Sequence, residues 1–118
     1  MTAEEAKNFA HDWIAAWNAH DLDRIMSHYD DAVELISPTA ARLLSLPDGK
    51  VAGKAGLRVY FEKGLNAFPD LRFELKDVLF GMNSVLLYYT NQKATHTGEF
   101  MELAPSGKVL RVVANYSA

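Results

Sequence analysis

The chain has 118 residues, a formal net charge of −3 and no cysteine. This length predicts one domain, residues 1–118, that is large enough to bury a substantial core. The charge balance lacks the Lys/Arg clusters that nucleic-acid binding requires, and the lack of cysteine excludes disulfides, thiolate metal sites and a cysteine nucleophile.

The chain begins with two predicted helices. Thr2 and Glu5 form a capping-box pattern, so the first helix is expected to begin at once and to run to about Asn18. Asp21 is positioned to cap a second helix, whose apolar residues extend to Tyr29. The first helix is amphipathic, and its aromatic residues recur every four positions: Phe9, Trp13 and Trp17. They form an aromatic stripe along one face of the helix, and this stripe needs a large apolar surface to cover it.

A short strand and a long loop are expected next. The strand covers residues 32–36 and is stopped by Ser37, which precedes a proline. Residues 39–53 contain Pro and Gly turn signals and predict a loop that folds back on the domain. This loop either closes over a pocket as a lid or plugs it with its leucines. Those leucines are Leu43, Leu44 and Leu46.

A third helix and an antiparallel sheet complete the chain. The helix is predicted over residues 57–68, with Tyr60 and Phe61 on its apolar face. The period then changes to two from Leu71 onward, with a phase slip near Asp77 that is typical of a bulge in a curved strand. Helices followed by antiparallel strands predict an α+β fold. The remaining strands are expected at residues 84–90, 95–103 and 108–116.

The last strand is largely apolar on both faces. Alternation places Leu110, Val112 and Tyr116 on one face, and Val109 and Val113 on the other. A sheet covered on one side only would show a polar outer face. We therefore expect a homodimer that pairs through the sheet, and the alternative is a twisted edge strand with ordinary surface valines.

No segment of the chain predicts insertion into a membrane or export. The N-terminal residues lack the charged and apolar regions of a signal peptide. No apolar run approaches the ~20 residues that a membrane-spanning helix needs. These features predict a cytoplasmic protein without membrane contacts.

Four segments carry a family resemblance that covers nearly the whole chain: 13–23, 29–38, 53–57 and 107–116. In this order they resemble the SnoaL-like and ketosteroid-isomerase-like branch of the nuclear transport factor 2 superfamily. The resemblance implies a cone of three helices wrapped by a strongly curved, mainly antiparallel sheet, with an apolar pocket at its open end. It does not imply one reaction, because the superfamily includes isomerases, cyclases, dehydratases, epoxide hydrolases and transport adaptors.

Glu99 is the main catalytic candidate. Period-two alternation places it on the same strand face as Met101. If this face lines the pocket, desolvation should raise the pKa of Glu99 and suit it to acid, base or hydrogen-bond donor roles. The resemblance implies the same role, because ketosteroid isomerases hold an acid here that binds the substrate oxyanion. The alternatives are a structural carboxylate bound to Arg111 or a tyrosine, or an edge residue in water.

The rest of the ketosteroid isomerase set does not carry over. The resemblance implies a general base where Ser37 stands, and a serine is not a proton-abstracting carboxylate. It implies an oxyanion-binding tyrosine where Trp13 stands, and an indole donates one N–H but is not an acid. Steroid isomerisation by that mechanism is therefore not expected.

The remaining aromatic residues suggest a site for a flat or alicyclic apolar ligand. Tyr60 and Tyr116 are the expected partners of Glu99, because one lies on the inward helix face and the other ends the last strand. The alternative is that the aromatic stripes are ordinary core. The expected ligand-binding residues are Trp13, Trp17, Tyr29, Ser37, Phe61, Met101 and Val112.

Two functional hypotheses follow. The first is a cofactor-free small-molecule-binding domain in which Glu99 performs acid–base chemistry, assisted by Tyr60 or Tyr116 and by the Trp13 N–H. The four histidines lack the i, i+4 pairing of a helical metal site, so no metal is expected. The second hypothesis is a non-catalytic dimerisation or adaptor module whose core is filled by its own aromatic residues.

Overall fold

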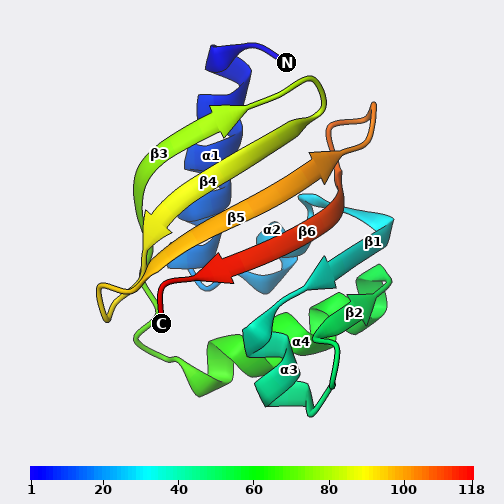
Figure 1. The fold of residues 1–118 in the computed structure, drawn as a ribbon, viewed down its shortest axis with the longest axis vertical. Helices are drawn as coiled ribbons and strands as arrows, with labels where there is room; N and C mark the ends of the chain where they lie inside the picture. The colour runs from blue at the N-terminus through cyan, green and yellow to red at the C-terminus, as the bar shows by residue number, and fades with distance from the viewer.

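Four helices and one six-stranded sheet make up the fold, which a computed structural model describes for residues 1–118 (Figure 1). The helices are α1 (Ala3–Asn18), α2 (Leu22–Met26), α3 (Pro38–Leu44) and α4 (Lys54–Ala67). The strands are β1 (Tyr29–Ile36), β2 (Lys50–Ala52), β3 (Glu74–Phe80), β4 (Ser84–Thr90), β5 (His96–Leu103) and β6 (Val109–Tyr116). No helix has the length and apolar character to cross a membrane.

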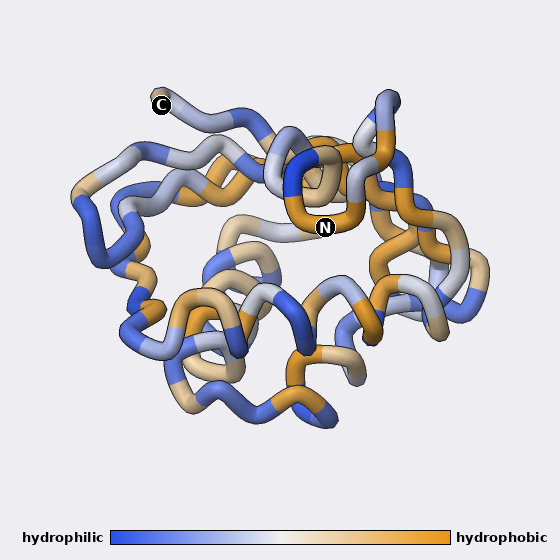
Figure 2. The backbone as a smooth tube through the Cα atoms, turned by 90° about the horizontal axis from the view of Figure 1, so that it is seen from below, coloured by the Kyte–Doolittle hydropathy of each residue, from blue (hydrophilic) through white to orange (hydrophobic).

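The sheet has the strand order β2-β1-β6-β5-β4-β3, and only β1 and β6 pair in parallel. Helices packed on a mainly antiparallel sheet confirm the predicted α+β class. Polar and apolar residues alternate along the chain (Figure 2), as expected where each element buries one side. The buried side of the sheet, which packs against the helices, is called the inner face below.

The first two helices begin where the sequence predicts. Thr2 and Glu5 form the capping box, and the Asp21 side chain accepts a hydrogen bond from the Arg24 N–H. The predicted second helix is too long, because it ends at Met26 and Tyr29 already belongs to β1. Tyr29 continues the helical spacing of the apolar residues before it, but its backbone pairs with β6 and its side chain is buried there.

The expected loop at residues 39–53 is wrong, because it contains α3 and β2. The Ser37 hydroxyl caps α3, whose first residue is a proline, and this arrangement is favourable for a short helix. The structure therefore has four helices where three were expected. Leu43, Leu44 and Leu46 are partly buried against the core and do not line the cavity described below. They form neither a lid nor a plug.

A close backbone approach holds the turn between α3 and β2 against the end of β1. Ser37 donates its N–H to the Gly49 carbonyl at 3.0 Å, and Gly49 has a φ of 63°. A Cβ atom at Gly49 would lie 2.6 Å from the Ser37 carbonyl oxygen. Only glycine fits both the positive φ and this approach, which fixes the position of Ser37.

Two register shifts decide which side chains reach the inner face. The predicted bulge in β3 is present between Leu75 and Asp77, although this strand begins at residue 74 rather than 71. A second shift, in the pairing of β5 with β6, reverses the predicted faces at the start of β6. Val109 is fully buried, whereas Leu110 is only partly buried. A shift of one residue has this effect because side chains alternate along a strand.

Aromatic rings from α1, β4 and the segment before β3 form the centre of the core. Trp13 stacks on Phe73 with ring centroids 5.9 Å apart, and Phe73 lies 4.5 Å from Tyr89. Trp17 meets Phe61 of α4 edge to face at 4.7 Å. The aromatic stripe of α1 is thus covered by other aromatic rings, which also form one wall of a cavity.

Candidate functional site

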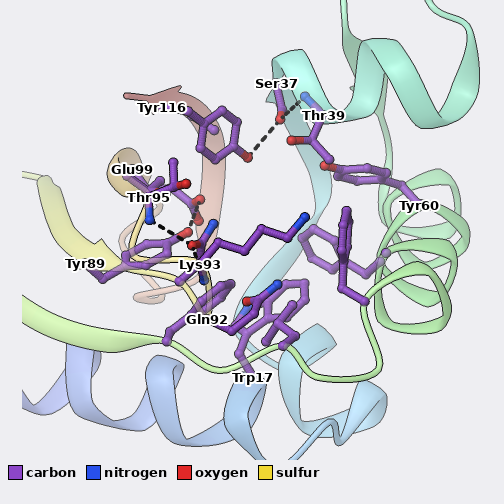
Figure 3. Close-up of a pocket in the computed structure, with 18 of the residues that line it drawn as sticks. Trp17, Ser37, Thr39, Tyr60, Tyr89, Gln92, Lys93, Thr95, Glu99 and Tyr116 are labelled. Atoms are coloured by element: carbon purple, nitrogen blue, oxygen red, sulfur yellow. Dashed lines mark hydrogen bonds between the residues drawn. The ribbon is translucent and has the colours of Figure 1, made fainter. Parts of the chain in front are cut away.

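A cavity of about 290 Å³ lies between the inner face of the sheet and helices α1, α3 and α4 (Figure 3). The aromatic core therefore leaves space that the side chains do not fill. Seven of the residues predicted for the site line this cavity: Trp13, Trp17, Ser37, Tyr60, Phe61, Glu99 and Tyr116.

Glu99 is buried on the inner face of β5 and lines the cavity. Its Oε1 accepts a hydrogen bond from the Tyr89 hydroxyl at 2.9 Å (Figure 3). Its Oε2 has no hydrogen-bond partner in the protein and is not sealed from the cavity. Desolvation raises the pKa of Glu99 to about 7, and the Tyr89 hydrogen bond opposes this rise. A carboxyl group in this state exchanges protons readily near neutral pH.

The alternative partner that was considered for Glu99 lies elsewhere. Arg111 contacts Glu102 at 3.4 Å, and both side chains are on the opposite side of the sheet from Glu99. Glu99 is therefore bound to a tyrosine and has no ion-pair partner.

Ser37, Tyr116 and Tyr60 form a group of hydroxyls beside Glu99. The Ser37 and Tyr116 oxygens lie 3.1 Å apart, and Ser37 also accepts the backbone N–H of Thr39 (Figure 3). Burial raises the pKa of Tyr60 and of Tyr116, and the charge of Glu99 raises both further. The two phenols therefore stay protonated at neutral pH, which suits them to donate hydrogen bonds to a ligand oxygen.

Three of the predicted ligand-binding residues do not line the cavity. Tyr29, Met101 and Val112 are buried in the core and are absent from the cavity wall. Strand alternation predicts the face of Met101 and Val112 correctly, but it does not say whether a helix covers that part of the face.

The Trp13 N–H is not free to assist Glu99 as predicted. It donates to the Tyr29 hydroxyl at 3.0 Å, in a fully buried contact between α1 and β1. The Trp17 N–H, in contrast, is buried without any hydrogen-bond partner. A buried donor in this state costs about 1–3 kcal/mol.

Several residues of the cavity wall were missed by the sequence analysis. Tyr89 was not singled out from the sequence, yet this residue lies opposite Thr97 and on the same face as Glu99. Pairing residues 84–90 with 95–103 across their turn would have found it. The polar residues at one side of the cavity had no signal in the sequence, because a short helix and a turn hold them there: Thr39, Arg42, Asn91, Gln92, Lys93 and Thr95.

Comparison with known proteins identifies the family. The sequence model of the SnoaL-like domain matches residues 10–115. A solved SnoaL-like protein of unknown function from Burkholderia thailandensis is 37% identical, covers 99% of this chain and 98% of its own, and superposes with a TM-score of 0.94. No match was found among curated protein sequences.

Two more distant structures share the fold. An NTF2-like protein of unknown function from Cytophaga hutchinsonii is 13% identical, with a TM-score of 0.72 over 95% of this chain and 89% of its own. A putative ketosteroid isomerase from Kribbella flavida is 14% identical, with a TM-score of 0.76 over 98% of this chain and 79% of its own. At such identities the likeness supports the fold alone.

Proposed function

The chain belongs to the SnoaL-like family of the nuclear transport factor 2 superfamily, and from this premise we propose that it binds an apolar, oxygen-bearing small molecule and acts on it by acid–base chemistry at Glu99. One observation carries the proposal. A buried carboxyl group lines a cavity of about 290 Å³ with one oxygen bound to Tyr89 and the other without a protein partner. The second oxygen is therefore available to a ligand in the cavity.

The proposed reaction class is proton transfer at a carbon atom beside a carbonyl group. The ionised Glu99 removes a proton from that carbon, and the Tyr60 and Tyr116 hydroxyls hydrogen-bond to the enolate oxygen that forms. Glu99 then returns the proton to a different carbon, so the substrate is isomerised and the carboxylate is regenerated. Glu99 has both roles because Ser37 occupies the place of the usual base. The proposal needs no cofactor, because side chains supply every group.

This proposal has a direct test in deuterium exchange. We expect the wild-type protein to catalyse exchange at the carbons beside the carbonyl of 2-tetralone in D₂O, followed by proton NMR. Glu99→Gln keeps the shape of the side chain but cannot accept a proton, so its rate should fall by about 100-fold or more. Glu102→Gln is the matched control, because Glu102 lies on the same strand but on the outer face. Full exchange activity in Glu99→Gln would contradict the proposal.

The non-catalytic alternative, a module with a filled core, is disfavoured by the cavity. Dimerisation itself is compatible with ligand binding, and we propose that two copies pair through the outer face of the sheet. An apolar row crosses this face in register over five strands: Leu79, Leu86, Phe100, Val113 and Ile36. A second copy would cover this row and remove it from water.

The dimer proposal predicts a change in mass on a single substitution. Wild-type protein should sediment at twice the 13.1 kDa of one chain, and Phe100→Asp should sediment as a monomer, because a charge at the centre of the row is not tolerated in an interface. Val59→Asp is the control, since Val59 is 56% exposed on α4, away from the sheet. A wild-type monomer at micromolar concentration would rule out this dimer.

A further inference from the structure

Two positively charged side chains line the cavity without a partner in the protein. Arg42 comes from α3 and Lys93 from the turn between β4 and β5. Neither forms a salt bridge, although Arg24, Arg58 and Arg111 all do. Glu99 is the only acidic side chain in the cavity wall, and its carboxyl group is bound to Tyr89.

Both positively charged side chains influence groups inside the cavity. The side chain of Lys93 extends across the cavity toward Thr39 and Tyr60 (Figure 3). Burial raises the pKa of Tyr60 and Tyr116, and the positive charge of Arg42 partly offsets this rise for both phenols. The positive charge of Arg42 therefore acts on the two hydroxyls through space, without a hydrogen bond to either.

The charge of the cavity is unbalanced. When Glu99 is protonated, the wall carries two positive charges and no negative side chain. Even with Glu99 ionised, the side chains of the wall carry one more positive than negative charge. Arg42 and Lys93 are both exposed to solvent, so they stand at the open side of the cavity, where two cations without a counter-charge attract an anion that enters it.

From this arrangement we infer that the natural ligand is an apolar carboxylic acid whose carboxylate binds between Arg42 and Lys93. Its apolar body then lies against Trp17, Phe61 and Phe73, and an oxygen at its other end reaches the Glu99 carboxyl group on the sheet side. A planar carboxylate accepts two hydrogen bonds from a guanidinium while an ammonium neutralises it from the side. The inference rests on the proposed function, since it names the ligand class of the same cavity.

The test compares an acid with its own ester. We would measure binding of 6-hydroxy-2-naphthoate and of its methyl ester by isothermal titration calorimetry at pH 7.5. The two compounds share the apolar body and the distal hydroxyl and differ in the charge. We expect the acid to bind wild-type protein at least tenfold more tightly than the ester.

Charge-removing variants locate the effect. Lys93→Met and Arg42→Met should each reduce the preference for the acid to about threefold or less, while ester affinity stays within about twofold. Lys93 is an exposed turn residue, so its variant should fold normally. Lys7→Met is the matched control, because it removes one charge from an exposed, unpaired lysine in the first half of α1 and should keep the full preference.

A filling variant shows that both compounds enter the cavity. Gly64 lines it, and a Cβ atom there would meet no atom within 4 Å. Gly64→Leu should weaken acid and ester alike by tenfold or more, whereas Ala55→Leu at an exposed position of the same helix should change neither.

The possible results separate the inference from the proposed function. Equal affinity for acid and ester, or a preference that survives in both charge variants, would overturn the carboxylate inference and leave the cavity as a ligand site. Acid binding that survives in Gly64→Leu would place the acid outside the cavity and would also overturn it. Failure of both compounds to bind wild-type protein would count against the ligand-binding function as well.

Discussion

The protein is expected to lose stability as the pH rises from about 4.5 to about 7, and Glu99→Gln should abolish this loss. Burial raises the pKa of Glu99 from its ordinary value of 4.5 to about 7. Between these values the folded state binds a proton that the unfolded state has released. Stability therefore falls with rising pH in this window. The stabilisation that the protonated Glu99 gives to the folded state is fully present only below it.

The size of the effect follows from the shift. About 2.5 pH units at roughly 1.4 kcal/mol each correspond to about 3 to 4 kcal/mol in total, from well below pH 4.5 to well above pH 7. Glutamine accepts the same hydrogen bond from Tyr89 but has no charge to desolvate, so Glu99→Gln should be more stable than wild type above pH 7.

Urea unfolding at pH 5 and pH 8 measures the difference. Wild type should lose more free energy of unfolding between these values than Glu99→Gln, by about 3 kcal/mol. Glu102→Gln controls for the loss of a carboxylate on the outer face and should behave as wild type. Asp12 does not interfere, because Arg24 and His28 lower its pKa and place its titration below this window. An identical pH response in Glu99→Gln would show that Glu99 is solvated.

Trp13→Ala is expected to lower the free energy of unfolding by about 4 kcal/mol. Trp13 is 1% exposed, and its ring contacts Trp17, Phe73 and Tyr89 with centroids 5.5 to 5.9 Å apart. Removing this ring leaves a large void at the centre of the aromatic core, which the surrounding rings fill only in part. Chemical denaturation followed by circular dichroism measures the loss.

The hydrogen bond of Trp13 is tested separately. Trp13→Phe keeps a ring but leaves the Tyr29 hydroxyl without its donor, and we expect a loss of about 2 kcal/mol. A double-mutant cycle with Tyr29→Phe should give a coupling energy of about 1 kcal/mol. A coupling near zero would mean that the indole N–H does not need Tyr29 and is available to a ligand.

The sequence predicts most of the fold because its local signals agree with one another. The capping box at Thr2 and Glu5 and the strand at residues 84–90 appear as predicted. The predictions from sequence fail where one local residue pattern is compatible with two kinds of secondary structure. Tyr29 has helical spacing but joins a strand, and α3 is too short for a helical period to emerge from its sequence. Tertiary packing decides both cases.

The candidate site is predictable in part for a similar reason. Alternation along β5 places Glu99 on the inner face, because a strand has only two faces. The same rule selects Met101 and Val112, which share that face but are covered by core. Arg42 and Lys93 are brought to the cavity by chain segments that meet only after folding, so no spacing in the sequence connects them.

The position of β6 has a consequence for how the domain assembles during synthesis. β6 is the last strand along the chain, yet it lies between β1 and β5 in the sheet. Until it leaves the ribosome, β1 with β2 and β3 with β4 and β5 are two separate pieces, each with an open edge toward the missing strand. The parallel contact between β1 and β6 closes a loop of about 70 residues, which delays completion of the sheet. The nascent chain therefore depends on β6 to join the two pieces into one sheet.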